Sequence, residues 1–118
     1  MKRASLIAIM IVFSTICRAE ISVNQYEGAR KHWKRGDVLE TQVSGMIIGL
    51  GWANAELVDR KEIPLYCQPG KLALTAENAL DLLDEFLKRP SLQSPEARQL
   101  PYGTVLLAAL QDAFPCKN

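Results

Sequence analysis

Two cysteines and a single histidine are the residues of this chain best suited to covalent or metal chemistry. Cys67 and Cys116 stand far apart in the sequence, and His32 precedes both. A thiol beside an imidazole base makes a nucleophile, thiols grouped with further ligands bind zinc, and two thiols in an oxidising compartment form a disulfide. Because there is no CxxC spacing and only one histidine, we favour a Cys67–Cys116 disulfide over a free reactive thiol or a metal pair.

Paired carboxylates are the other candidate for chemistry. Asp81 and Glu85 are four positions apart, so both would lie on one face of a helix. General acid–base work needs a carboxyl whose pKa is raised by apolar surroundings, and this pair has no apolar neighbour on its face. We therefore predict a solvated surface there. The sequence also lacks a phosphate loop, a metal-ligand spacing and a dinucleotide fingerprint, so we expect no enzyme activity, no catalytic residue, no cofactor and no metal.

The first nineteen residues have the pattern of a secretory signal peptide. Lys2 and Arg3 precede an apolar run at residues 6–16, and small residues at Cys17 and Ala19 predict cleavage after Ala19. A membrane anchor is the alternative, but the run is shorter than the roughly 20 apolar residues that span a bilayer. Lipidation of Cys17 is disfavoured by the bulky residue before it. We expect a periplasmic protein that does not remain in the membrane after cleavage.

The remaining residues, 20–118, are enough for one small domain with a single core. Eleven of the fourteen basic residues remain against thirteen acidic ones once the signal peptide is removed. The resulting charge near −2 argues against a nucleic-acid partner, which requires a basic face to neutralise phosphates. The basic run at residues 30–35 is explained as a solvated helix face, with Trp33 in the core and cations in the last helical turn.

Apolar spacing and capping residues predict four helices and no sheet. The first helix is expected after an Asn24 cap with Glu27 completing a capping box, and the second covers residues 38–59 after Asp37. The third starts after Thr75 and stops before Pro90, and the fourth runs from Pro101 to about residue 113. No alternation typical of a strand is present. The predicted fold is all-α, a small four-helix domain closed by one disulfide.

The same spacing predicts which faces are buried. The second helix is the longest and is apolar over much of its circumference, so we expect it to be central. Gly45 and Gly49 share one of its faces, which predicts close approach of another helix. Buried stripes are expected in the first, third and fourth helices, while three acidic residues of the third helix are expected to face water. The stripes are Tyr26, Ala29 and Trp33; Leu80, Leu83, Phe86 and Leu87; and Val105, Leu106, Ala109, Leu110 and Ala113, and the acidic residues are Asp81, Asp84 and Glu85.

Two segments resemble the Rap/Tai immunity proteins of type VI secretion. Residues 66–90 hold a Cys-x-Pro at Cys67 and a helix that ends in Leu-x-x-Pro at Pro90, and residues 101–116 end in Ala-Leu-x-x-Ala-Phe-Pro-Cys. The run at residues 45–49 is similar to a glycine-bounded helix of the family, with Met46 where an aromatic residue is usual. Many members carry a second cysteine pair between the first two helices, and this chain has Val43 at one of those places.

The resemblance implies a periplasmic protein that binds a cell-wall-degrading effector, often a peptidoglycan amidase, and inhibits it by steric obstruction. Exposed connections on a rigid scaffold favour such contacts. We expect the partner-binding element in the polar connection at residues 88–98, whose candidate side chains are Lys88, Arg89, Gln93, Glu96 and Arg98.

A homodimer through the glycine face of the second helix is a further expectation. The alternative function is a small helical periplasmic chaperone or stress-binding protein without a toxin partner. It would expose apolar surface on acidification, and the sequence offers no histidine cluster for such a switch.

Overall fold

The computed structural model describes residues 20–117 of the chain. The predicted signal peptide, with its cleavage site and Cys17, lies outside these residues. Four α-helices make up most of the described chain: α2 (Val23–Lys31), α3 (Val38–Asp59), α4 (Ala76–Leu87) and α5 (Tyr102–Ala113). Two short 3-10 helices, η1 (Pro90–Leu92) and η2 (Ala97–Gln99), lie between α4 and α5. Residues 20–117 contain no β-strand, and the predicted all-α class is confirmed.

The helix starts follow from local capping. Asp37 accepts a hydrogen bond from the backbone N–H of Glu40 at 3.1 Å, and Thr75 accepts one from Asn78 at 3.2 Å, as predicted. The predicted cap of the first helix is wrong: α2 begins two residues earlier. Ser22 and Gln25 form its capping box, because their side chains bond to each other's backbone N–H groups.

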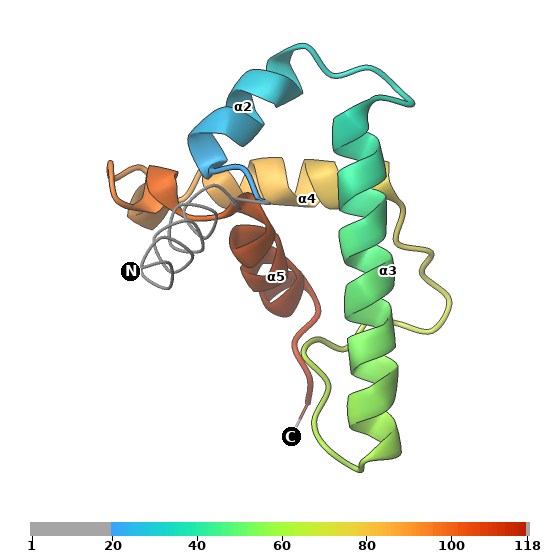
Figure 1. Cartoon of the computed structure of the whole chain (residues 1–118). Helices are drawn as coiled ribbons and strands as arrows, with labels where there is room; N and C mark the ends of the chain where they lie inside the picture. Colours follow the sequence, from blue (N-terminus) through green and yellow to red (C-terminus); the bar gives the residue numbers. More distant parts are fainter. Residues whose placement is uncertain (1–19, 118) are drawn as a thin grey trace, which may run out of the picture.

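Helix α4 lies at the centre of the bundle and contacts both α3 and α5 (Figure 1). Its stripe of Leu80, Leu83 and Leu87 is buried, and the buried side chains of α5 and α2 pack against it. The predicted burial of these three helices is right for most positions. Ala29 and Ala113 are corrections: both lie at the edge of their stripes and are exposed, while Trp33 is only half-buried.

Helix α3 is not central, contrary to the prediction. Only Leu39 and Val43, in its first turns, are buried, and the second half extends beyond the other helices (Figure 1). The close helix contact predicted at the glycines is wrong as well. A methyl group added at Gly45, Gly49 or Gly51 would meet no atom within 4 Å outside its own helical turn.

The predicted disulfide is confirmed. Cys67 and Cys116 are bonded, with 4.9 Å between their Cα atoms, and the backbone N–H of Cys67 donates to the carbonyl of Phe114 at 2.8 Å. The bond therefore fastens the α3–α4 connection to the segment after α5. Asn54 fastens the same connection to α3, since its side chain bonds to the backbone of Leu65 and Tyr66.

None of the helices in residues 20–117 has both the length and the apolar character needed to cross a membrane.

Candidate partner-binding surfaces

The predicted binding segment, residues 88–98, lies within an elbow, residues 88–101, that projects from the bundle between α4 and α5 (Figure 1). Its inner side chains are held by the scaffold. Gln93 donates to the carbonyl of Leu87 at 2.6 Å, and Arg98 donates to the Gln93 side chain at 3.2 Å. Arg98 also forms an ion pair with Glu27 of α2, and its side chain is largely buried. Gln93 and Arg98 thus fix the shape of the elbow, and of the two Gln93 remains exposed while Arg98 presents little surface to a partner.

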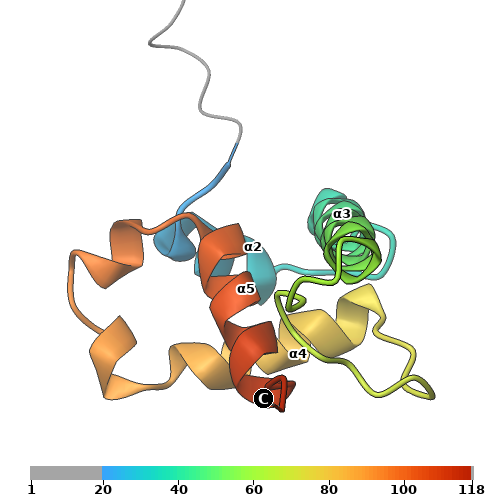
Figure 2. The same ribbon diagram turned by 90° about the horizontal axis from the view of Figure 1, so that it is seen from below.

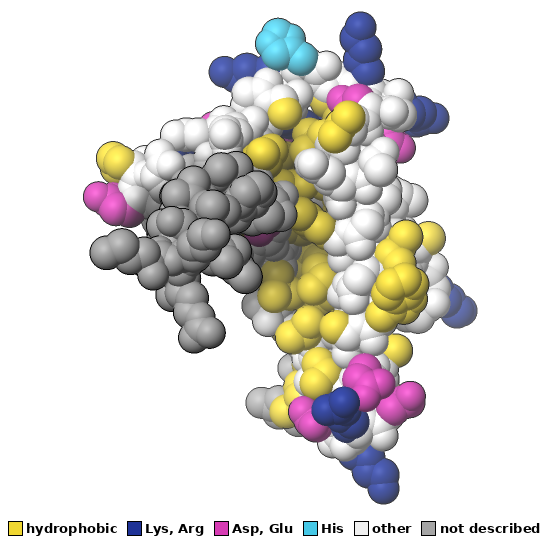
Figure 3. Space-filling view, in the orientation of Figure 1, with side chains coloured by type: hydrophobic (Ala, Val, Ile, Leu, Met, Phe, Trp, Pro, Cys, Tyr) yellow, Lys and Arg dark blue, Asp and Glu magenta, His cyan; other side chains and the backbone are white. Residues whose placement is uncertain are grey.

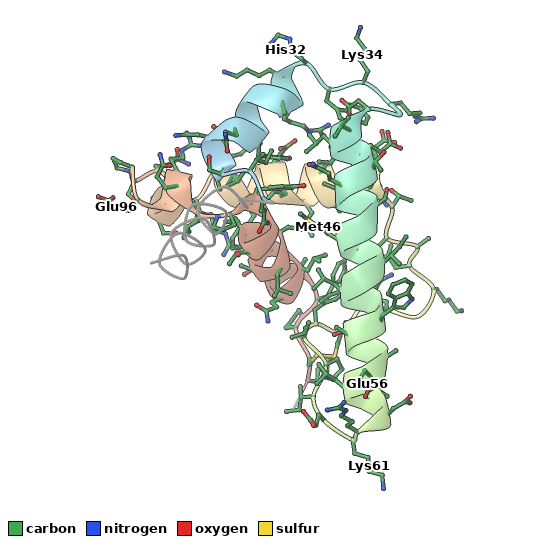
Figure 4. The ribbon with its side chains drawn as sticks, viewed as in Figure 1. His32, Lys34, Met46, Glu56, Lys61 and Glu96 are labelled. Carbon is green, nitrogen blue, oxygen red and sulfur yellow. A yellow bond between two sulfur atoms is a disulfide. The ribbon has the colours of Figure 1, made fainter. Side chains whose placement is uncertain are left out.

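The other three predicted residues lie on the outer surface of the elbow. Arg89 lies over the ring of Phe86, with its guanidinium carbon 4.3 Å from the ring centroid, and pairs with Asp112 of α5. Lys88 pairs with Glu85 on α4. Glu96 is at the tip and points away from the bundle (Figure 4). The structure therefore brings the five residues onto one rigid projection, of which Glu96 is the outermost charge.

A polar cluster joins α2 to α4. The hydroxyl of Tyr26 donates to Asp84 at 2.6 Å, and Arg30 bonds to Asp84 and Asp81, each at 2.8 Å. This corrects the prediction that Asp84 faces water. This contact was hard to predict from the sequence, because Tyr26 and Arg30 lie more than 50 residues before Asp84.

The cluster determines how its members ionise. Burial raises the pKa of Tyr26 far above its ordinary value, and the hydrogen bond to Asp84 raises it further because a phenolate would face a carboxylate. Burial opposes the charge of Arg30, but the hydrogen bond and charge of Asp84, with Asp81, outweigh it and raise the pKa of the guanidinium. The cluster therefore holds a charged Arg30 and a neutral Tyr26, which suits attachment of α2 to α4.

The structure separates the residues that could have done chemistry. Asp81 faces Arg30 of α2 while Glu85 pairs with Lys88, so the two carboxylates do not share a site. His32 and Lys34 point outward at the far end of α2 (Figure 4), away from the disulfide. Residues 20–117 hold no group of His, Cys, Asp and Glu side chains arranged for a metal ion.

The outward face of α3 is exposed, whereas the sequence predicted a central helix with its glycine face as a homodimer contact. Residues 41–55 contain no charged side chain, yet Ile48 is 53% exposed and Trp52 is 73% exposed. Apolar side chains along α3 reach the surface in Figure 3. The absence of charge over this run is the sequence feature that indicates an apolar face on α3. The sequence alone could not distinguish an exposed apolar face from a buried one.

An apolar groove lies on the inner side of α3, where the helix faces α5. It is lined by Met46, Gly49 and Leu50 from α3 and by Gly103, Thr104 and Leu107 from α5, and Met46 points toward it in Figure 4. Glu20 lies at its rim, and its carboxylate accepts a hydrogen bond from the backbone N–H of Gly103 at 2.7 Å. Seen from below, α3 and the elbow lie on opposite sides of α5 (Figure 2). The candidate surfaces on α3, its outward face and its inner groove, are therefore separate from the elbow.

No protein-family model, no curated protein and no solved structure matches this chain.

Proposed function

We propose that this chain is a periplasmic immunity protein that binds a cell-wall-degrading effector of type VI secretion, of the peptidoglycan amidase class, and blocks it sterically. The observation that carries the proposal is the elbow at residues 88–101. It is exposed, and its conformation is set by bonds inside the protein, notably those of Gln93 and Arg98. A preorganised projection loses little conformational entropy when it enters a cleft, which favours affinity.

Two further observations support the proposal. The motif-bearing segments at residues 66–90 and 101–116, which resemble the Rap/Tai family, are joined by the Cys67–Cys116 disulfide. A disulfide suits an oxidising compartment such as the periplasm, where an inhibitor of incoming cell-wall enzymes has to be present. Inhibition would need no chemistry from this chain. The elbow would cover the cleft of the enzyme, with Glu96 at its leading end.

Binding and protection test this function directly. The disulfide-bonded protein should co-purify with a peptidoglycan amidase effector, preferably one encoded beside it, and should prevent that enzyme from cleaving peptidoglycan. No complex and no protection would contradict the proposal. Fractionation and the mass of the mature N-terminus should show a periplasmic protein that begins at Glu20; a diacylated Cys17 would contradict simple cleavage.

A charge reversal at the tip tests the elbow. Glu96→Lys should weaken effector binding by about tenfold or more, in the range of a central interface residue, without changing thermal unfolding, because Glu96 points away from the bundle. Glu62→Lys is the matched control, since it reverses an exposed charge just after α3. If the complex forms but both variants bind equally well, the effector contacts another surface.

The exposed face of α3 favours a second candidate, a small periplasmic chaperone. Apolar surface outside the core is what such a protein uses to hold unfolded clients. This function predicts suppression of client aggregation, with dye binding that rises on acidification. Suppression that survives Trp52→Glu would contradict a role for this face.

A further inference from the structure

The base of the elbow, where it continues into α5, is held by the first residues of the described chain (Figure 1). Residues 20–23, which we call the N-terminal anchor, run antiparallel to the end of the elbow, with Ser22 opposite Pro101. In this bridge the backbone N–H of Val23 donates to the carbonyl of Leu100 at 2.9 Å. The anchor therefore bonds to the arm of the elbow that returns to the bundle.

Helix α5 begins without a side-chain cap of its own. The other three α-helices of the described chain each have a capping side chain, whereas α5 follows Pro101, which offers none, and has no acidic residue in its first turn. The N-terminal anchor supplies acceptors for the first N–H groups of α5. The carbonyl of Ile21 accepts from Tyr102 at 3.1 Å. The carboxylate of Glu20 accepts from Gly103 at 2.7 Å, and its negative charge also suits the positive end of the helix dipole.

The glycine at position 103 leaves the space that this carboxylate occupies. A methyl group on Gly103 would overlap the carboxylate of Glu20 and would lie 3.2 Å from the sulfur of Met46. At every other glycine of the described chain, an added methyl group would meet no such atom within 4 Å. The close approach of Glu20 to α5 is therefore specific to this position and depends on the absence of a side chain there.

We propose that Glu20 is a positioning residue of the elbow. Its bond to Gly103 keeps the end of the elbow attached to the bundle, and effector binding depends on that attachment. This rests on the proposed function, because it concerns the elbow as the binding element. A loop held in one conformation loses less entropy on binding than a loose one. Arg98, which pairs with Glu27 of α2, acts on the same arm, so the N-terminal part of the chain holds this arm at two places.

The position of signal-peptide cleavage gains a role from this contact. Cleavage after Ala19, as proposed, makes Glu20 the first residue of the mature protein and retains the acceptor. A chain that begins at Ile21 lacks the carboxylate and should behave as Glu20→Ala does. Cleavage one residue later would therefore weaken the hold on the elbow.

Hydrogen exchange measured by NMR tests the attachment without any effector, on the disulfide-bonded protein whose mass shows that it begins at residue 20. In Glu20→Ala the amides of Tyr102, Gly103 and residues 97–100 should exchange about fivefold faster, the factor expected from loss of a typical capping interaction. The melting temperature should fall by about 4–8 °C. Glu20→Gln keeps an oxygen acceptor, so it should lose less in both measurements. Glu62→Ala, which removes an exposed carboxylate just after α3, is the control and should change neither.

Gly103→Ala provides a second, independent variant. In the unmodified protein the new methyl group displaces the carboxylate of Glu20, so the melting temperature should fall although alanine favours a helix over glycine. In the Glu20→Ala background the same substitution meets only the flexible end of Met46 and should leave the melting temperature unchanged or raise it. An equal effect of Gly103→Ala in both backgrounds would show that the carboxylate does not hold this site.

Effector binding, measured well below the melting temperature, separates positioning from general stability. Glu20→Ala should weaken the complex with the peptidoglycan amidase by about fivefold, because the looser arm has to be ordered on binding. Asn54→Leu is the matched control. Its contacts are with the connection between α3 and α4, so it should destabilise the fold and leave binding unchanged.

Three results would count against the proposal in different ways. Unchanged exchange at residues 97–103 in Glu20→Ala would overturn it whether or not an effector binds. Faster exchange with unchanged binding, where Glu96→Lys does weaken the complex, would overturn the link between attachment and binding, and so would equal binding losses for Glu20→Ala and Asn54→Leu. If the unmodified protein binds no amidase, the proposed function is wrong, and the exchange rates alone decide whether Glu20 holds the elbow.

Discussion

Removing the carboxylate of Asp84 should cost far more stability than its position on a polar helix face implies. In the structure this carboxylate accepts from the buried hydroxyl of Tyr26 and from Arg30, whose side chain is only 19% exposed. Asp84→Ala leaves the hydroxyl with one distant acceptor, the carbonyl of Leu80 at 3.5 Å. Arg30 keeps its bond to Asp81, so the phenol suffers the larger loss.

The expected cost follows from these contacts. A hydrogen bond to a charged acceptor contributes about 1.5–3 kcal/mol when the partner is buried. The ion pair with Arg30, whose two side chains are 19% and 34% exposed, adds about 0.5–1 kcal/mol, because solvent still screens it in part. We therefore expect Asp84→Ala to lower the free energy of unfolding by about 2–4 kcal/mol, a large part of the roughly 5–15 kcal/mol typical of a domain.

Urea unfolding of four proteins would measure this: the unmodified protein, Asp84→Ala, Tyr26→Phe and the double variant. The phenylalanine ring keeps the stacking of Tyr26 on Tyr102, whose centroids are 5.3 Å apart, and removes only the donor. The cycle should show a coupling of about 1–2 kcal/mol between the two sites. Glu85→Ala is the control, because Glu85 and its partner Lys88 are both exposed, and it should change stability by less than about 0.5 kcal/mol. Equal costs for Asp84→Ala and Glu85→Ala, or no coupling with Tyr26→Phe, would refute the reasoning.

Three further predictions concern the rest of the fold. Replacing Cys67 and Cys116 by serine opens a loop of sequence separation 49 and should lower the free energy of unfolding by about 4 kcal/mol; a change below about 1 kcal/mol in urea unfolding would contradict this. Burial raises the pKa of all three tyrosines above the ordinary value, so the native state holds phenolic protons that the unfolded chain releases. The contribution of the tyrosines to the free energy of unfolding should thus be fully present below about pH 10 and should fall above it by up to about 1.4 kcal/mol per pH unit for each tyrosine. The measurement is the free energy of unfolding as a function of pH. A value that does not change above pH 10 would contradict this, because the tyrosines would then have the same pKa in the native and the unfolded states. Asn54→Leu should destabilise the protein by about 1–3 kcal/mol, since the backbone groups of Leu65 and Tyr66 lose their partners; a melting temperature that stays the same or rises would contradict this.

The elements that sequence reasoning predicted well are those that local chemistry determines. The caps at Asp37 and Thr75, the leucine stripe of α4 and the end of that helix before Pro90 all depend on residues within a few positions. The disulfide was also predictable, because a predicted signal peptide leaves two cysteines, Cys67 and Cys116, and these have one simple pairing. For the elbow, composition indicated an exposed connection, but the bonds that stiffen it through Gln93 and Arg98 could not be derived from spacing.

Errors occurred where partners are distant in the sequence. Helix α3 is apolar on several faces, and periodicity shows that a face is apolar without showing what covers it. The prediction therefore assigned the glycine face to the core, although only Leu39 and Val43 are buried. Asp84 was placed in water for the same reason, since its partners come from another helix. Asn54 interrupts the apolar pattern of α3, and the structure explains it as the anchor of the following connection.

The first residues of the described chain are fastened to its last helix. Val23 donates to the carbonyl of Leu100 at 2.9 Å, Tyr102 donates to that of Ile21 at 3.1 Å, and Glu20 accepts from Gly103. Contacts that join such distant segments form late, because the whole intervening chain has to be ordered first. For a chain exported as proposed, the leading residues would cross the membrane well before their partners. The N-terminal segment would then remain unfolded while it crosses the membrane. The domain would complete its fold only after α5 has crossed as well.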